Sequence, residues 1–288
     1  IKSVKLQYSK KTSMDSSKRK DISELIYNKI KEKQDELTSA YQASKNQIGF
    51  FYIDDLLPDH IAKECFKVFP DTSEMRCLKS IREYKYVSAQ MDKHHKLLED
   101  VLYAFQDSKI VSLIGEICNI DSLYADESLY AGGLSQMAHD NFLNPHLDNS
   151  HDAERERWRV LNLLYYVTPD WKTENGGHLE LWPDGPKKEP VVIESKFNRL
   201  AIMATHETSW HSVNQVNVNR SRCCISNYYF SDEPLKDSDK FHVTKFRGRP
   251  EDTFTNIILD LDANLRMLVR KVFKNGIRKN PHVYKKKD

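Results

Sequence analysis

The stretch Arg159-Val160-Leu161-Asn162-Leu163-Leu164-Tyr165-Tyr166-Val167 decides the fold, because a run of this kind is typical of a strand inside a sheet. Strand side chains alternate between the two faces, so Asn162 and Tyr166 project to one face with Leu164 between them. Polar groups in such an apolar strand are costly unless they form hydrogen bonds. A bound acid would satisfy both side chains, and the alternative is a tyrosine bonded to a backbone carbonyl.

Further short apolar runs lie on both sides of this strand and are separated by Asn, Gly, Pro and Asp. They fall around residues 128–137, 178–182, 190–194, 198–204 and 222–230. Many short strands with turn residues at this spacing favour a sandwich or barrel of the jelly-roll or cupin kind. The sequence therefore predicts a fold that is mainly β.

Helical patterns flank these strands. Near the N-terminus, apolar residues recur on one helix face, at Ile22, Leu25, Ile26, Ile30, Leu37 and Tyr41. A buried strand is predicted over 48–53, and Asp59 is the predicted cap of the next helix. Two helices are predicted around 97–105 and 111–117, and a C-terminal helix over 257–272 ends near Gly276.

The composition narrows the class of protein. The chain has 288 residues, 39% of them hydrophobic, which is enough for one large domain with appendages. Its net charge of +2 gives no argument for a polyanionic partner such as a nucleic acid, and no apolar run is long enough to span a membrane. Five cysteines, odd in number and without CxxC spacing, indicate reduced thiols of a cytoplasmic protein.

A His-x-Asp pair, His146 and Asp148, is the first candidate for chemistry. At the end of a strand both side chains lie on the same face, so one metal ion could bind both. His211 is the expected third ligand because it opens a segment that leads into the strand at 222, whereas its rival His206 precedes a predicted turn. Two imidazoles and one carboxylate leave the open positions that non-haem Fe(II) oxygenases need, although this set also suits Mn(II) or Zn(II).

An arginine enters the last predicted strand. Arg222 precedes the apolar run 223–230, and a buried guanidinium in such a place needs an anion, which a carboxylate can supply through two hydrogen bonds. The distal carboxylate of 2-oxoglutarate would fit. Arg220 shares the parity of Arg222 and could bind the same group, and either arginine could instead be an exposed charge on an edge strand.

Taken together, these motifs resemble the prolyl-4-hydroxylase-like branch of the Fe(II)/2-oxoglutarate-dependent dioxygenase superfamily. The resemblance covers roughly residues 47–232. It is carried by five motifs that follow the His-x-Asp pair in the family's order, and the matching stretches are 145–149, 159–171, 176–183, 198–202, 210–213 and 222–230.

The resemblance implies a double-stranded β-helix core with N-terminal and C-terminal α-helices around it. It also implies that His146, Asp148 and His211 are the catalytic iron ligands. Iron(II), 2-oxoglutarate and O₂ would be the cofactor and co-substrates, with ascorbate as a candidate reductant.

The resemblance further implies how 2-oxoglutarate is held. Arg222 matches the basic residue that binds its C5 carboxylate, Tyr166 matches a tyrosine that contacts the same carboxylate, and Asn162 and Tyr228 match pocket positions that vary in type. The interval from His211 to Arg222 is about two residues longer than usual, which keeps Arg220 as an alternative.

The expected organisation has three parts. Residues 1–46 form a basic arm and N-terminal helix, 47–235 form the dioxygenase domain with its β-helix core at about 122–232, and 236–288 form a C-terminal helix and basic tail.

The implied reaction is hydroxylation of a C–H bond, with 2-oxoglutarate decarboxylated to succinate and CO₂. We expect a small polar metabolite or saccharide precursor as substrate, with a prolyl residue of a protein or peptide as the alternative. No membrane or nucleic-acid partner is expected. An alternative of another class is a non-catalytic cupin-like binding protein. The presence of all three expected iron ligands and of Arg222 argues against it.

Overall fold

A computed structural model describes residues 18–250, 258, 259 and 284. Residues 1–17 of the predicted basic arm lie outside these residues, as do the basic tail apart from 284 and the C-terminal helix apart from 258 and 259. Within the described part, the α-helices with printed bounds are α2 (Gln34–Ser44), α3 (Asp59–Lys67), α4 (Lys96–Ala104) and α5 (Ser108–Cys118). No helix among the described residues is both long enough and apolar enough to cross a membrane.

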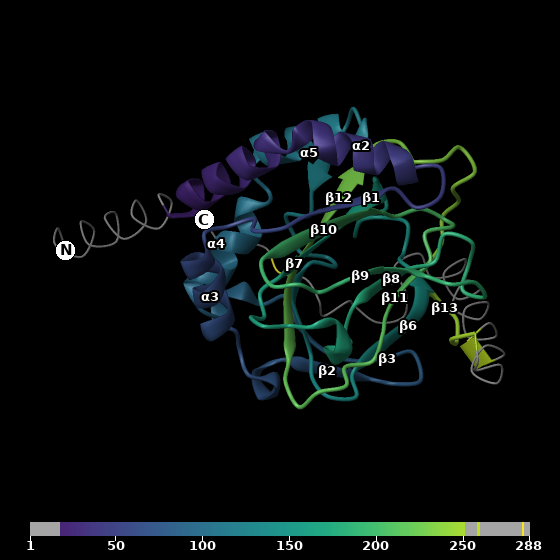
Figure 1. The fold of residues 1–288 in the computed structure, drawn as a ribbon. Coiled ribbons are helices and arrows are strands. Elements are labelled where there is room, and N and C mark those ends of the chain that lie inside the picture. The colour runs from purple at the N-terminus through teal and green to yellow at the C-terminus, as the bar shows by residue number, and fades with distance from the viewer. Residues whose placement is uncertain (1–17, 251–257, 260–283, 285–288) are drawn as a thin grey trace.

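The centre of the molecule is an antiparallel sheet of 13 strands (Figure 1). Along its main path the strand order is β1-β10-β7-β12-β5-β3-β6-β11-β8-β9, while β13 pairs with β6, β2 with β3 and β4 with β12. The bounds are β1 (Phe50–Ile53), β2 (Arg76–Lys79), β3 (Glu83–Ser88), β4 (Tyr124–Ala125), β5 (Gly133–Met137), β6 (Phe142–Leu147), β7 (Trp158–Tyr166), β8 (Leu179–Leu181), β9 (Val191–Ile193), β10 (Arg199–Ala204), β11 (His211–Val213), β12 (Arg222–Ser231) and β13 (Lys245–Phe246).

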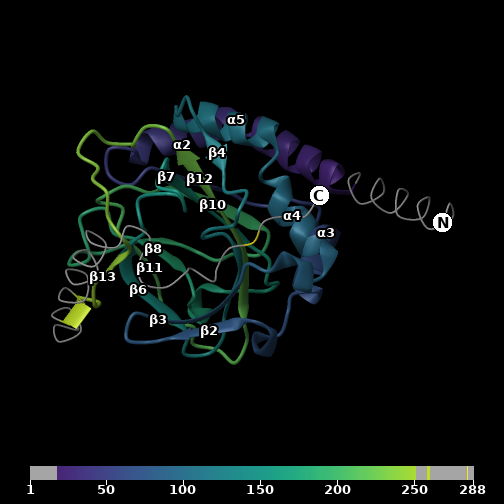
Figure 2. The same ribbon diagram turned by 180° about the vertical axis from the view of Figure 1, so that it is seen from behind.

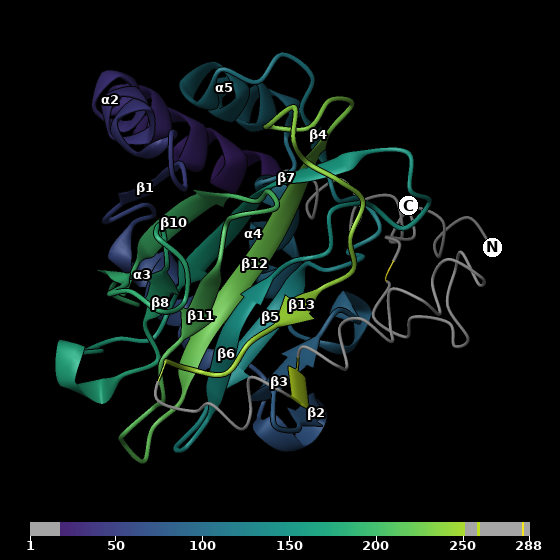
Figure 3. The same ribbon diagram turned by 90° about the vertical axis from the view of Figure 1, so that its right-hand side faces the viewer.

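The sheet curls on itself, so its two ends face each other. A buried cluster joins Tyr166 of β7, Met203 of β10 and Cys224 of β12 to Leu179 of β8 and Ile193 of β9, although β8 and β9 lie at the far end of the strand order. Figure 3 shows the long strand β12 crossing in front of this roll. The predicted fold class, a jelly-roll-like β core flanked by helices, is confirmed.

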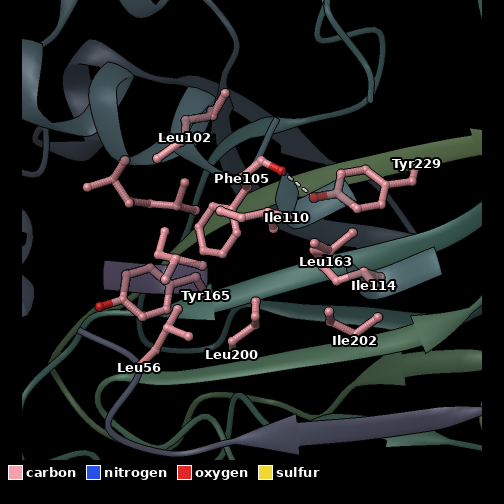
Figure 4. Close-up of a cluster of buried hydrophobic side chains, with 14 of the residues drawn as sticks. Leu56, Leu102, Phe105, Ile110, Ile114, Leu163, Tyr165, Leu200, Ile202 and Tyr229 are labelled. Carbon is pink, nitrogen blue, oxygen red and sulfur yellow. Dashed lines mark hydrogen bonds between the residues drawn. The ribbon is translucent and has the colours of Figure 1, made fainter. Parts of the chain in front are cut away.

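Helices cover the outer face of the sheet. Figures 1 and 2 show α2, α4 and α5 on one side of the curled sheet and β6, β8 and β11 on the other. Between helices and sheet lies the main hydrophobic core, in which Phe105 and Ile114 face Leu163 and Tyr165 of β7 (Figure 4). The Tyr229 hydroxyl donates a hydrogen bond to the Phe105 carbonyl oxygen, which ties β12 to the end of α4.

The N-terminal helical segment packs onto the same core. Residues 18–32 are helical and α2 follows after a turn at Lys33. Most of the predicted apolar face is buried, at Ile22, Ile26, Ile30, Leu37 and Tyr41. Leu25 is the exception, because its side chain is 37% exposed, so its assignment to the packed face was wrong.

Other differences from the sequence prediction have simple causes. The strand predicted over 48–53 begins only at Phe50, and Tyr52 is 46% exposed because its side chain lies on the opposite face from the buried Phe51 and Ile53. Asp59 does not cap α3, since it lies in the first turn and Pro58 occupies the capping position. The hairpin of β2 and β3 was not predicted, because its side chains are exposed or half-buried and leave no apolar pattern.

We predict that Ile26→Ala lowers the free energy of unfolding by about 2–5 kcal/mol, because it leaves a cavity in the core under the sheet. Leu25→Ala on the same helical segment should cost less than about 1 kcal/mol, since that side chain is partly in water. Urea denaturation of both variants measures the difference. Equal losses would contradict the packing described for this segment.

Candidate metal centre and co-substrate cavity

Three potential metal ligands meet where β6 and β11 pair. His146 lies near the end of β6, Asp148 follows one residue beyond that strand, and His211 is the first residue of β11. The antiparallel register places His211 directly opposite His146. One ligand atom from each of the three residues lies within 4.8 Å of the other two. No other such group of His, Cys, Asp and Glu occurs among the described residues.

Both imidazole rings are held in orientations suited to metal binding. Nδ1 of His146 lies 3.0 Å from the Asn144 carbonyl oxygen, and Nδ1 of His211 lies 3.0 Å from that of Ser209. Each Nδ1 therefore carries the proton, which leaves the Nε2 lone pair available. The Nε2 atoms lie 3.6 Å and 3.7 Å from the two carboxylate oxygens of Asp148.

The protonation states of His146 and Asp148 also favour a bound cation. Burial, together with the neighbouring His211, lowers the pKa of His146 to about 3, so its ring is neutral at physiological pH. Burial alone would raise the pKa of Asp148, but nearby positive charge, including that of Arg159, outweighs it and holds that pKa below its ordinary value. A neutral imidazole and an ionised carboxylate are the forms that bind metals.

The residues present fit an iron(II) ion. The Asp148 side chain is 10% exposed, and its Oδ2 has no hydrogen-bond partner among the described residues. A buried carboxylate oxygen left in this state is costly unless a cation binds it. Two imidazoles and one carboxylate, without a thiolate, are the ligand set of non-haem Fe(II) oxygenases.

A cavity of about 120 Å³ opens beside these ligands, and His146, Asp148 and His211 lie in its wall. Arg222, the first residue of β12, enters the cavity and is almost fully buried. Its Nη2 donates to Met137 Sδ, a weak acceptor, and its Nε has no hydrogen-bond partner in the described part of the chain. A buried guanidinium with a free donor needs an anion, which a carboxylate would supply.

The other predicted co-substrate residues fall into two groups. Tyr166, Asn162 and Tyr228 all line this cavity, and the sheet register pairs Tyr228 with Asn162. The Asn162 Oδ1 lacks a hydrogen-bond partner among the described residues, which leaves it available to a ligand. Arg220 is exposed and does not line the cavity, because its guanidinium donates to the carbonyl oxygens of Pro169 and Asp170.

The rival histidine also lies apart from the triad. His206 is not among the grouped ligands, and its Nδ1 accepts a hydrogen bond from the Thr208 amide at 3.2 Å. Burial lowers the pKa of His206 to about 3. It lines a second, smaller cavity on the side of Asp148 that Arg159 occupies.

Sequence reasoning gave Arg159 no role, although its Nη1 lies 3.8 Å from Asp148 Oδ2. The cause is a β-bulge: Tyr229 pairs with Leu161 and Phe230 pairs with Arg159, so Val160 is an extra residue in β7. Without this extra residue, regular alternation would place Arg159 on the same face of β7 as Leu161, which faces the hydrophobic core. A bulge leaves no mark in a hydrophobic pattern, so only an arginine next to a buried run could have pointed to this residue.

The family comparison agrees with this geometry. Residues 132–230 match the family model described as "2OG-Fe(II) oxygenase superfamily", a span that contains the triad and Arg222. The chain contains a 2OG-Fe(II) oxygenase domain. It is therefore an oxidoreductase whose cofactor is Fe(II) and whose co-substrate is 2-oxoglutarate.

Solved structures resemble this oxygenase in fold. A prolyl-4-hydroxylase of Pseudomonas putida superposes with a TM-score of 0.50 at 14% sequence identity, covering 68% of this chain and 99% of that one. A prolyl 4-hydroxylase structure from Phytophthora capsici gives a TM-score of 0.52 at 16% identity, covering 88% of this chain and 80% of that one. A comparison with curated proteins finds no match. At these identities the likeness shows a shared fold and nothing of the substrate.

We predict that Asp148→Ala weakens Mn²⁺ binding strongly, because it removes a metal ligand. The loss should exceed the roughly 10- to 100-fold that is typical when a residue that only hydrogen-bonds to a ligand is removed. Isothermal titration of the metal-free oxygenase measures this affinity. Asp140→Ala is the matched control, because Asp140 is exposed, pairs with His139 and lies outside the triad. If both variants bound Mn²⁺ equally well, the triad would not be the metal site.

The two arginines can be separated in the same way. A hydrogen bond to a charged group contributes about 1.5–3 kcal/mol, so Arg222→Gln should raise the Kd for 2-oxoglutarate on the Mn²⁺-loaded oxygenase by roughly tenfold or more. Arg220→Gln should leave that Kd unchanged, because its guanidinium bonds only to surface carbonyl oxygens in the described contacts. The reverse result would assign the carboxylate to Arg220.

Proposed function

We propose that this oxygenase hydroxylates a C–H bond of a small polar metabolite or saccharide precursor. In this proposal His146, Asp148 and His211 hold Fe(II), and Arg222 with Tyr166 holds the C5 carboxylate of 2-oxoglutarate. Bound Fe(II) and 2-oxoglutarate supply the oxidising chemistry: O₂ is consumed, 2-oxoglutarate becomes succinate and CO₂, and one oxygen atom enters the substrate. The protein binds both organic molecules and sets which carbon is attacked.

The observation that carries the substrate class is the second cavity, which shares Asp148 with the first and is lined by Arg159 instead of Arg222. It is small, with a volume of about 10 Å³, so it could take one polar group of a substrate. Its wall is made by Asp148, Asn149, Ser150, Trp158, Arg159, Thr205, His206, Glu207, Asp239 and His242. Every one of these side chains carries a polar atom, so a substrate bound here gains most from hydroxyl, amide or charged groups of its own.

Arg159 is the strongest anchor in this wall. Its side chain is 3% exposed and its guanidinium carbon lies 4.4 Å from the centre of the Tyr228 ring. The Nε and Nη2 atoms have no hydrogen-bond partner among the described residues. A cation bound to Asp148 would compete with Arg159 for the negative charge of that carboxylate. A polar acceptor on the substrate would then satisfy the free donors.

Prolyl hydroxylation is the alternative, and one experiment tests both. The Fe(II)-loaded oxygenase is incubated with 2-oxoglutarate and air, and succinate formed above the substrate-free rate is measured for sugars, amino acids, other polar metabolites and proline-containing peptides. Stimulation by a polar metabolite supports the proposal. Stimulation by the peptides alone would replace it with prolyl hydroxylation. Wild-type protein that bound neither metal nor 2-oxoglutarate would favour a binding protein.

For the substrate found in this way, we predict that Arg159→Gln raises the KM by roughly tenfold or more, because a buried charge-assisted hydrogen bond is lost. Arg157→Gln is the matched control, since Arg157 is two residues away and 41% exposed, and it pairs with Asp232 at the surface. The KM for 2-oxoglutarate is measured in both variants. A substrate KM unchanged by Arg159→Gln would remove Arg159 from the binding site.

A further inference from the structure

We propose that residues 242–249, which follow the matched family segment 132–230, position both histidines of the metal triad. We call residues 242–249 the strap. The inference rests on the proposed assignment of the metal to His146, Asp148 and His211. It makes the strap a working part of the oxygenase, although it lies beyond residue 235, where the sequence placed the end of the domain.

The strap closes an edge of the sheet that would otherwise be open at the metal. On one side β6 pairs with β11 along its length, but on the other side β3 reaches only Phe142 and Leu143. Beyond Leu143 this side of β6 pairs with β13, in which Phe246 lies opposite His146 and Lys245 lies opposite Leu147. Figure 3 shows β13 lying beside β6.

Backbone hydrogen bonds hold the strap along the whole ligand segment. The Arg247 amide donates to the Pro145 carbonyl oxygen at 2.8 Å, and the Ser150 amide donates to the His242 carbonyl oxygen at 3.1 Å. These two bonds lie on either side of His146 and Asp148. The strap therefore fixes the backbone that carries two of the three ligands, and an unpaired buried edge here would be costly.

Phe246 acts on the ligand ring itself. Its ring stacks on the imidazole of His146 with centroids 5.2 Å apart and planes 17° apart. The side chain is buried in a cluster with Leu143 and Val213, the last residue of the other ligand strand. With Nδ1 of His146 already held by the Asn144 carbonyl, this stack leaves the ring one favoured orientation.

Arg249 reaches the strand of the third ligand. Its Nη2 lies 2.8 Å from Glu180 Oε2 and 3.2 Å from the Val213 carbonyl oxygen. The same Glu180 oxygen accepts a hydrogen bond of 2.6 Å from the hydroxyl of Ser212, which follows His211. In turn Trp182 Nε1 donates to Ser212 Oγ at 2.7 Å. The arginine supplies the counter-charge that a buried carboxylate requires, and so fixes β11 from the outer face.

Both contacts are made between protein groups alone, so the strap should lower the cost of ordering the ligands. Groups that orient a metal ligand typically change metal affinity by roughly 10- to 100-fold when they are removed. Phe246→Ala should therefore raise the Kd for Mn²⁺ by about tenfold or more. Phe246→Leu keeps the apolar packing without the stacked ring and should give a smaller loss in a well-folded protein.

Two controls separate positioning from loss of stability. Phe241→Ala removes a ring just before the strap that stacks on His151, which is not a ligand, and should leave the Kd for Mn²⁺ unchanged. Ile30→Ala destabilises the core far from the metal and should lower the urea midpoint without changing that Kd. Isothermal titration with Mn²⁺ and urea denaturation of each metal-free variant provide both readouts.

The inference is overturned if Phe246→Ala and Phe246→Leu fold and bind Mn²⁺ as tightly as wild type. It is also overturned if Ile30→Ala raises the Kd for Mn²⁺ as much as the Phe246 variants do, because the loss of affinity would then come from the loss of stability alone. A failure of the underlying metal assignment looks different, because wild-type protein would then not bind Mn²⁺, or Asp148→Ala would bind it unchanged.

Discussion

The pairing of β6 with β11 is the constraint on which the site depends. Its register sets His146 opposite His211, and Asp148 follows at the end of the same strand. Two imidazoles and a carboxylate are thereby brought within 4.8 Å in a buried place where the carboxylate has no hydrogen-bonding partner on Oδ2 among the described residues. A divalent cation resolves this arrangement, because it takes up the charge of Asp148 and the free nitrogen lone pairs together.

Two further strands bring residues to the cavity beside the triad. Strand β12 brings Arg222 into the cavity and β7 brings Tyr166, so a doubly charged co-substrate would meet the metal at one end and a guanidinium at the other. The charges of a divalent cation and Arg222 balance those of Asp148 and 2-oxoglutarate. Arg159 then remains as an additional buried cation beside Asp148, in the wall of the second cavity. In the proposed function, 2-oxoglutarate therefore binds beside Arg222 and the substrate binds beside Arg159.

Much of this could be predicted from the sequence, because the decisive residues follow period two along buried strands. The alternation of Asn162 and Tyr166 identified the cavity face of β7, and His146 with Asp148 followed from their parity. The choice between Arg222 and Arg220 could not be made, because parity is the same for both. It takes tertiary structure to show that one guanidinium enters the cavity while the other bonds surface carbonyls.

Other features leave no local signal. The bulge at Val160 turns Arg159 toward Asp148, yet the hydrophobic run continues through it unchanged. Strand β13 is two residues long, and nothing in Lys245 and Phe246 alone indicates that they pair with a ligand strand. Leu25 fits helical periodicity, but its side chain is 37% exposed. For Arg159 and β13 the pairing strand lies far away in the chain and decides the outcome.

The triad is expected to hold iron with open positions for 2-oxoglutarate. Anaerobic titration of the Fe(II)-loaded protein with 2-oxoglutarate, followed by visible absorption, tests it most directly. We expect a metal-to-ligand charge-transfer band that saturates at equimolar 2-oxoglutarate and iron, and that is absent in Asp148→Ala. Iron-loaded wild-type protein that shows no such band, or a variant that shows it undiminished, would contradict the claim.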